Sequence, residues 1–358
     1  MSLEKKDILQ ILNATKDEIV KYMLETSKKD KPITYSKNIF IPLTEICKND
    51  CGYCNFKKSP SDSNAVILKS KKEILESLKK AEKHGCKEAM FAFGEDADSE
   101  KIVQEKLEEY GYQNMTDYVY DICKMTLDKT NLLPHTNGGN YTYEDLKKLK
   151  EVNASMGLML ENSSERLMEL PAHKKSPGKK PSTRLQTIEN AGKLKIPYTT
   201  GLLIGIGETY EEIADSLLEI KKLSDTYNHI QEIIIQNFTP IKGIEMENSP
   251  EPTLLTMMKV VIAASLLFAD CDVSIQIPPN LNNETSQVFL LCGADDWGGV
   301  SPVSPDYVNI TSPWPGIDEL EKITVDVGFK LTERLCVYDK YIGEEWLNEF
   351  ILNKIRKI

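Results

Sequence analysis

Three cysteines within eight residues are the side chains of this sequence with the clearest chemical use. Cys47, Cys51 and Cys54 lie in the run CKNDCGYC, a spacing that chance placement of eight cysteines would produce roughly 0.004 times. A structural zinc site closes on four ligands, but no second cysteine pair lies nearby and the nearest histidine is His84. An iron–sulfur cube held by three thiolates leaves one iron open to a small molecule. The spacing favours such a catalytic cluster, with a zinc or redox site as the alternative.

The elements that must position these cysteines follow a repeating pattern. From Asn38 onward, short apolar runs alternate with segments whose apolar residues recur at helical spacing, which is typical of βα units. This pattern predicts an α/β fold, a (β/α)8 TIM-type barrel, with a doubly wound open sheet as the alternative. The predicted strands are residues 39–43, 88–93, 131–134, 155–160, 198–204, 232–238, 272–277 and 288–292.

The two ends of the chain are predicted to be helical. Residues 1–31 interleave apolar and charged residues as one helix, and a terminal helix is expected near the end of the chain. We therefore expect three parts: a helical extension over 1–32, a barrel over 33–341 and a C-terminal helix over 342–358.

Composition and charge argue against some classes of function, nucleic-acid binding and membrane association among them. A net charge of −11 over 358 residues makes generic nucleic-acid binding unexpected, because such binding needs a basic surface. The longest apolar run, 260–269, is too short to span a membrane, and the N-terminus does not resemble a signal peptide, so we expect no membrane association and a cytoplasmic location. A basic run near Pro177 is expected to be a solvated loop, with phosphate binding as the minor alternative; it contains Lys174, Lys175, Lys179, Lys180 and Arg184.

Several residues lie where predicted strands end, which in a barrel is the functional face. Gly94 permits close backbone approach, and Glu95 and Glu161 offer carboxylates to ammonium or hydroxyl groups. Arg184 presents a planar fork that matches a carboxylate. A turn, a helix N-terminal acid and a surface arginine are the plainer alternatives for these positions. The glycine-rich run 201–208 is not a dinucleotide fingerprint, because its glycine spacing differs.

The loops after the third, sixth and eighth predicted strands are too polar for a core. Amides, carboxylates and an aromatic plane that converge at a barrel mouth suit a polyhydroxylated, heteroaromatic substrate. For proton transfer the candidates are His135 and Asp295. For substrate binding the candidates are Asn137, Gln236, Asn237, Asp296 and Trp297.

The cysteine run, with Tyr53 directly before its third cysteine, resembles the signature of the radical S-adenosylmethionine (SAM) superfamily. The resemblance implies one 4Fe–4S cluster held by Cys47, Cys51 and Cys54, with exchangeable SAM bound at the open iron. One electron from such a cluster splits SAM into methionine and a 5'-deoxyadenosyl radical. The implied SAM contacts are Tyr53, Gly94, Glu95, Glu161, Arg184, Ile204 and Gly205. In this reading Glu95 holds the amino group, Glu161 the ribose and Arg184 the carboxylate of SAM.

Within that superfamily, residues 33–341 resemble the CofG-type FO synthase subunit 1 family of deazaflavin coenzyme biosynthesis. The resemblance rests on the run LPHTN at 133–137, on H-x-x-SPGK at 173–179, on TTG at 199–201 and on DWGG at 296–299. One departure is the sequence NGG at 137–139, where Asn-Pro-Gly is expected.

That family resemblance implies a reaction and its partners. The substrate is 5-amino-5-(4-hydroxybenzyl)-6-(D-ribitylimino)-5,6-dihydrouracil; hydrogen abstraction, ring closure onto the phenol and loss of ammonia give the deazaflavin FO, so the enzyme is a lyase. A second radical SAM subunit, of CofH type, is the implied partner. Two alternatives remain: a radical SAM enzyme acting on tyrosine or in menaquinone or thiamine synthesis, and a non-catalytic iron–sulfur or zinc protein.

Overall fold

The computed structural model describes residues 3–26 and 31–358. Its centre is a closed barrel of parallel strands in which β1 pairs with both β2 and β8. Closure confirms the TIM-type barrel and excludes the open sheet. The barrel strands are β1 (Ile33–Thr44), β2 (Glu88–Phe93), β3 (Leu133–Asn137), β4 (Ser155–Gly157), β5 (Tyr198–Ile204), β6 (Ile230–Asn237), β7 (Ser274–Gln276) and β8 (Asp296–Val300).

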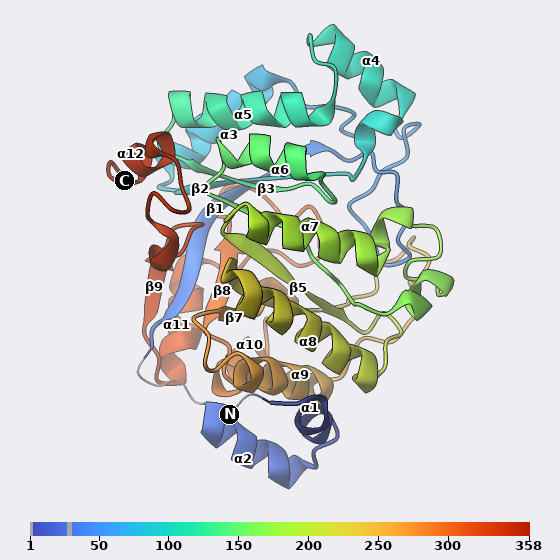
Figure 1. The fold of residues 1–358 in the computed structure, drawn as a ribbon, viewed down its shortest axis with the longest axis vertical. Helices are drawn as coiled ribbons and strands as arrows, with labels where there is room; N and C mark the ends of the chain where they lie inside the picture. Colours follow the sequence, from blue (N-terminus) through green and yellow to red (C-terminus); the bar gives the residue numbers. More distant parts are fainter. Residues whose placement is uncertain (1–2, 27–30) are drawn as a thin grey trace.

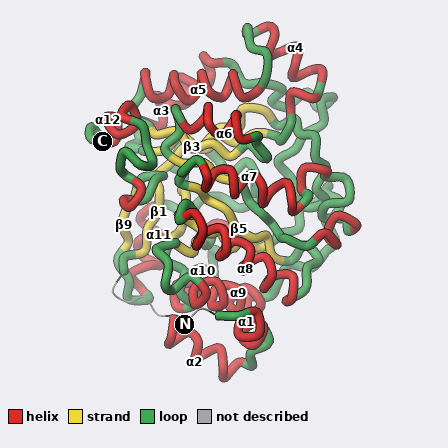
Figure 2. Tube along the Cα trace, viewed as in Figure 1, coloured by secondary structure: helices red, strands yellow, loops and turns green. Residues whose placement is uncertain are grey.

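Helices cover the outside of the barrel in chain order (Figures 1 and 2). β5 is buried along its whole length, as expected for a strand with helices outside and packed side chains inside. None of the described helices is both long and apolar enough to cross a membrane. The covering helices are α3 (Lys71–Lys83), α5 (Met115–Lys129), α6 (Tyr143–Lys150), α7 (Pro181–Lys193), α8 (Tyr210–Tyr227), α9 (Leu254–Leu267), α10 (Ser286–Leu291) and α11 (Ile317–Asp326), while α4 (Lys101–Glu109) lies further out, beyond α5 (Figure 1).

The N-terminal segment is two helices rather than the single predicted one. α1 (Lys5–Leu12) ends at Asn13, and α2 (Lys16–Thr26) begins after Thr15, whose backbone N–H and hydroxyl both donate to Glu18. This contact favours a new helix because it satisfies the backbone N–H of Thr15, a donor that has no partner within the helix. Both helices pack beside α9, and α1 also contacts α8. The short helix α12 (Glu349–Ile355) lies near the C-terminus.

The eighth strand lies later in the chain than predicted. Residues 288–292, expected as a strand, fall in α10 and at its end, and β8 is instead Asp296–Val300. A short apolar run cannot be assigned to helix or strand by periodicity alone. The segment predicted to be a substrate loop is therefore itself part of the barrel wall.

A ninth strand, β9 (Leu331–Arg334), completes one end of the barrel and was not predicted. β9 pairs in parallel with residues 33–36 of β1. β2 pairs with the same edge of β1, but only from Asn38 onward. β1 is long enough for both partners because it has twelve residues. The segment after β9 is thereby placed across the end of the barrel opposite the cysteines.

Candidate active site

The cysteine loop leaves β1 at Thr44 and is fixed by backbone hydrogen bonds to two other segments. Lys48 N–H donates to the carbonyl of Glu95 at 3.0 Å, beyond the end of β2. Gly52 N–H donates to the carbonyl of Ala172 at 3.1 Å, in the segment after β4. The loop is therefore held at the carboxyl ends of the strands by partners distant in sequence.

All three thiols of this loop line one cavity of about 260 Å3. Burial raises the pKa of Cys47 to about 11 and also raises the pKa of Cys54, and the neighbouring cysteines raise both further. Such thiols stay protonated at neutral pH unless a cation stabilises their thiolates, which is what bound iron does.

The chemistry of the donor set fits an iron–sulfur cluster, because three thiols of one loop line the same cavity. Across the part of the chain that the structure describes, no three metal-ligating side chains converge tightly enough to surround one ion. Thiolates on one zinc ion would lie about 3.8 Å apart, whereas in a cube each thiolate binds a different iron. The donors present therefore fit the expected 4Fe–4S cluster.

Two buried ion pairs line the same cavity. Arg184 Nη1 lies 3.1 Å from Glu95 Oε2, and Lys179 Nζ lies 2.7 Å from Glu161 Oε1. Burial alone would raise the pKa of Glu161, but Lys179 and Arg184 outweigh it and hold that pKa below its ordinary value. Two anions and two cations beside the thiols provide complementary charges for the ammonium and carboxylate of an amino acid.

Glu161 is held in an unusual backbone conformation. Its φ of +65° lies in the left-handed region, and its backbone pairs with Leu202 in an isolated bridge to β5. A glutamate at positive φ is strained, and such strain persists only where neighbouring contacts enforce it. The bend after β4 turns this carboxylate toward Lys179.

Two glycines let backbone segments meet around the ion pairs. A Cβ on Gly94 would lie 1.8 Å from the carbonyl oxygen of Ile46, so Gly94 allows β2 to pack against the cysteine loop. A Cβ on Gly178 would lie 1.8 Å from Glu95 Oε1, and the Gly178 N–H donates to Asn49 Oδ1 at 2.8 Å. Both positions exclude any larger residue unless the site shifts.

Tyr53 lines the cavity as predicted, and its hydroxyl lies 3.2 Å from His173 Nε2. Burial lowers the pKa of His173 to about 4, so the ring is neutral and Tyr53 meets an uncharged partner. Lys179 Nζ lies 5.9 Å from the centre of the Tyr53 ring. The tyrosine thus joins the cysteine loop to the ion-pair cluster.

The fifth strand presents a different residue from the predicted one. Leu203 lines the cysteine cavity, which is the outer of the two cavities of the barrel, whereas Ile204 and Gly205 line an unconnected peripheral cavity of about 390 Å3. Successive strand residues point to opposite sides, so only one of Leu203 and Ile204 can face inward. The structure does not bring Ile204 or Gly205 to the thiols.

A second, inner cavity of about 170 Å3 continues from the first into the barrel. Asn137 and Gln236 line both cavities and so mark their junction. Asn237 lines only the outer one, where its Oδ1 accepts from Asn282 Nδ2 at 2.9 Å. These three predicted amides are brought together.

His135 lines the inner cavity and has a defined tautomer. Its Nδ1 lies 2.7 Å from Ser155 Oγ, whose hydroxyl donates to the carbonyl of Cys336 at 2.8 Å. Because that hydroxyl proton is used, Nδ1 carries the hydrogen of His135 and Nε2 is left as an acceptor. Burial, followed by the charge of Arg334, lowers the pKa of His135 to about 4, which keeps the ring neutral.

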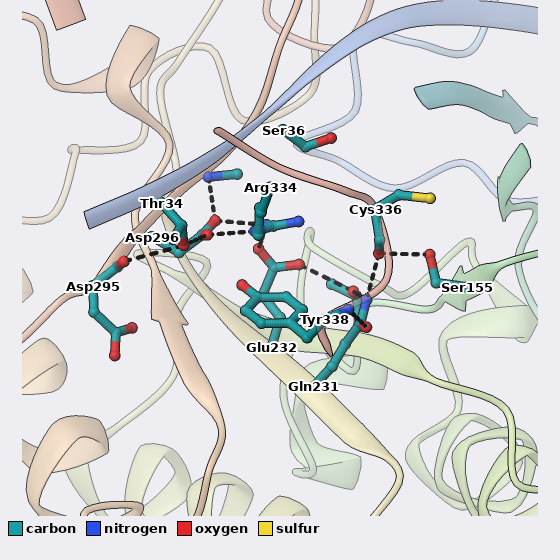
Figure 3. Close-up of polar contacts among 12 residues, drawn as sticks. Thr34, Ser36, Ser155, Gln231, Glu232, Asp295, Asp296, Arg334, Cys336 and Tyr338 are labelled. Carbon is teal, nitrogen blue, oxygen red and sulfur yellow. Dashed lines mark hydrogen bonds and ion pairs between the residues drawn. The ribbon is translucent and has the colours of Figure 1, made fainter. Parts of the chain in front are cut away.

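Asp295, Asp296 and Trp297 do not line either cavity, contrary to the sequence prediction. Asp295 Oδ1 accepts from the N–H of Ile275, and Asp296 pairs with Arg334 below the inner cavity (Figure 3). Trp297 is fully buried, and its indole N–H donates to Thr324 Oγ1 on α11 at 3.0 Å. These three residues lie away from the cavities because β8 begins at Asp296, whereas the predicted eighth strand ended at residue 292.

Sequence reasoning missed three residues at these cavities. Lys179 was assigned to a solvated loop, yet its side chain is 12% exposed. Leu203 was passed over for its neighbour, and Arg334 belongs to the unpredicted β9. The position of Lys179, two residues before the helix that carries Arg184, could have indicated that its side chain lies near Arg184. No local sequence feature indicates that Arg334 lies at a cavity.

Comparison with known proteins gives both a matching family model and highly similar relatives. Residues 41–220 match the model of the Radical SAM superfamily. A 7,8-didemethyl-8-hydroxy-5-deazariboflavin synthase of Methanobrevibacter smithii is 70% identical over 331 residues, which cover 92% of this chain and 98% of the relative. The protein of that name from Methanocaldococcus jannaschii is 54% identical over 356 residues, covering 99% and 98%.

Solved structures share the fold at low identity. The FeFe-hydrogenase maturase HydG from Carboxydothermus hydrogenoformans superposes with a TM-score of 0.74 at 16% identity, covering 98% of this chain and 78% of that one. Methylornithine synthase superposes with a TM-score of 0.70 at 17% identity, covering 93% and 95%.

Proposed function

The chain belongs to the 7,8-didemethyl-8-hydroxy-5-deazariboflavin (FO) synthase family of the radical SAM superfamily, and from this premise we propose how its residues divide the work. The protein is a radical SAM enzyme of deazaflavin biosynthesis that forms FO. The observation that carries the residue assignment is that one cavity brings together the three thiols and two buried ion pairs.

Cys47, Cys51 and Cys54 hold the 4Fe–4S cluster in this proposal, and Glu95, Glu161, Lys179 and Arg184 bind SAM. When bound, cluster and SAM together supply one electron and a carbon-centred radical that abstracts a hydrogen atom. Arg184 offers its guanidinium to the carboxylate of SAM and Glu95 accepts from its ammonium, while Glu161 accepts from ribose hydroxyls. The ion pairs that these groups form with one another keep them ordered before SAM arrives.

The substrate in this proposal is the joined hydroxybenzyl and ribityl-uracil intermediate, 5-amino-5-(4-hydroxybenzyl)-6-(D-ribitylimino)-5,6-dihydrouracil, supplied by a CofH-type radical SAM subunit. Asn137 and Gln236 at the cavity junction, with Asn237 beside them in the cysteine cavity, orient its pyrimidine ring through amide hydrogen bonds. The carbon ring regains aromaticity after closure by losing one proton and one electron: His135 Nε2, a neutral acceptor, takes the proton, the electron would return to the cluster, and ammonia leaves as the separate leaving group. Because a carbon–nitrogen bond breaks when ammonia leaves, the enzyme is an ammonia lyase in this proposal.

The test is anaerobic reconstitution followed by assays for iron and sulfide, 5'-deoxyadenosine and fluorescent FO, with and without the partner subunit. Cys51→Ser is expected to lose cluster absorbance and both products. Cys271→Ser is the matched control, because Cys271 lies outside the cysteine loop beside Asp225 and Asp270. Deoxyadenosine without FO in every mixture would reject the substrate, and a Cys51→Ser protein with normal turnover would reject the cluster assignment.

A further inference from the structure

The inner cavity is lined by polar side chains from nearly every side of the barrel. It meets the cysteine cavity at Asn137 and Gln236 and ends at Glu232 and Arg334. Polar groups reach it from seven strands: Asn38 on β1, Glu88 on β2, His135 on β3, Thr199 on β5, Glu232 on β6, Gln276 on β7 and Arg334 on β9. A barrel interior normally holds packed apolar side chains, so this composition needs a reason.

Two charged residues, Glu232 and Arg334, line the end of this cavity that we call its floor. Figure 3 shows the polar contacts that join them. Arg334 donates from Nε and Nη2 to both oxygens of Asp296, and from Nη2 to Glu232 Oε1 at 2.8 Å. Its Nη1 donates to the carbonyl of Leu335 at 3.0 Å, which leaves one of the five guanidinium N–H groups. Glu232 accepts in addition from Thr199 Oγ1 at 3.1 Å. The floor therefore presents ordered acceptors and one remaining strong donor.

Residues that line the cavity also carry buried polar atoms without partners in the described chain. These are Asn38 Oδ1, Asn280 Oδ1 and Trp314 Nε1. Asn38 is 1% exposed and Asn280 is 3% exposed. These three atoms are themselves shielded from the cavity, so the polar character of the site rests on the seven strand residues above rather than on them.

The distribution of these groups discriminates between parts of the substrate. A phenol ring needs apolar faces, which the outer cavity supplies through Phe56, Leu203 and Phe238. A pyrimidine ring needs amides at its edges, which the junction supplies through Asn137 and Gln236. A chain that carries a hydroxyl on successive carbons needs donors and acceptors all around it, because each hydroxyl both donates and accepts.

We propose that the inner cavity is a polyol site that takes the ribityl chain of the substrate, with Thr199, Glu232 and Arg334 binding its far hydroxyls. The proposal rests on the proposed function, since it assigns one part of that substrate to one part of the barrel. Threading the chain toward the floor leaves the rings at the junction and the hydroxybenzyl group beside the thiols, where hydrogen abstraction takes place.

The experiment measures binding of two fluorescent chromophores to the reconstituted holoenzyme. One is FO, and the other is the same ring system with an alkyl chain in place of the ribityl chain. We expect the wild type to bind FO at least about 10-fold more tightly. Thr199→Val and Glu232→Gln are each expected to weaken FO binding roughly 2- to 10-fold, the value of a lost hydrogen bond, and to leave the alkyl chromophore unaffected.

The two variants guard against a folding defect in either one. Arg334 is not substituted, because its loss would leave Asp296 buried without a counter-charge. The matched controls are Thr226→Val and Glu211→Gln, both exposed on α8, and both are expected to bind FO like the wild type.

Absence of FO binding, equal affinity for both chromophores, or a preference that both floor variants preserve would each overturn the polyol site. These outcomes are separate from failure of the proposed function, in which the wild type with its partner subunit would release deoxyadenosine but no FO.

Discussion

Single side chains decide the charge balance of the outer cavity, and Lys179 is the clearest case. It belongs to a basic run of the kind that is usually solvated, yet it is buried against Glu161 and near the ring of Tyr53. Its neighbour Lys180 is exposed. The difference arises because the turn at Pro177–Lys179 directs one lysine into the cavity and the next one outward.

Lys179→Met is expected to destabilise the protein by about 3 kcal/mol, because it leaves the Glu161 carboxylate buried without its closest counter-charge. It is also expected to weaken SAM binding at least about 10-fold. Denaturant unfolding and equilibrium dialysis of the reconstituted protein measure the two effects.

Lys180→Met is the control and should match the wild type in both measurements. Adding Glu161→Gln to Lys179→Met should recover much of the lost stability without recovering SAM binding. If the double variant were no more stable than Lys179→Met, the ion pair would not be the source of the loss.

At the scale of elements, the position of β8 separates structural residues from those of the cavity. β8 starts at Asp296, so Trp297 points outward to α11 and its indole N–H bonds to Thr324. Thr324 in turn donates to the carbonyl of Leu320 within its own helix. The tryptophan therefore fixes a helix against the barrel instead of contacting the substrate.

Thr324→Val keeps the shape of the side chain but removes the acceptor of the buried indole N–H. We expect a loss of about 1–3 kcal/mol in the free energy of unfolding, the cost of an unsatisfied buried donor, with an unchanged KM for the substrate. Thr332→Val on β9, where the side chain is exposed, should change neither quantity. If Thr324→Val raised the KM without lowering the free energy of unfolding, we would conclude that Trp297 contacts the substrate.

At the scale of the whole molecule, the end of the chain completes the barrel that its beginning starts. The carbonyl of Cys336 accepts from both Ser155 and Gln231, which begin or lie near the start of β4 and β6 (Figure 3). Through Ser155 this contact sets the tautomer of His135. The C-terminal segment thus takes part in the cavity although it lies far from the cysteines in sequence.

Burial of neutral histidines across the fold predicts how stability depends on pH. Burial lowers the pKa of His135, His173 and His229 to about 4, below the ordinary value of about 6.5. Between these values the unfolded chain binds protons that the folded chain does not. The free energy of unfolding is therefore retained above about pH 6.5 and falls as the pH drops toward 4.

Denaturant unfolding at about pH 7.5 and about pH 5.5 measures this loss, which we expect to be about 1.4 kcal/mol for each buried histidine. His229→Gln lies outside both cavities and should remove one such share of the pH dependence. The exposed His84→Gln should leave it unchanged. Equal pH dependence in wild type and His229→Gln would contradict a neutral buried His229.

The sequence by itself determined the features that depend on local spacing. The cysteine run and the alternation of strands and helices are set by residues close together in the chain, and β2 and β5 have the predicted bounds. Glu95 and Glu161 were placed at the cavity because strand ends of a parallel barrel meet at one face, and Arg184 because of the family resemblance. Their charged side chains could be recognised as candidate binding groups from the sequence alone.

Only the tertiary structure decided which way side chains point and which distant segments meet. Because β8 starts at Asp296, neither Asp296 nor Trp297 lines the cavity. Because side chains alternate along β5, Leu203 rather than Ile204 faces the thiols. Lys179 became a cavity residue through a turn, and Arg334 through a strand that pairs with β1 across almost the whole sequence. These outcomes depend on long-range pairing and packing, which local periodicity does not encode.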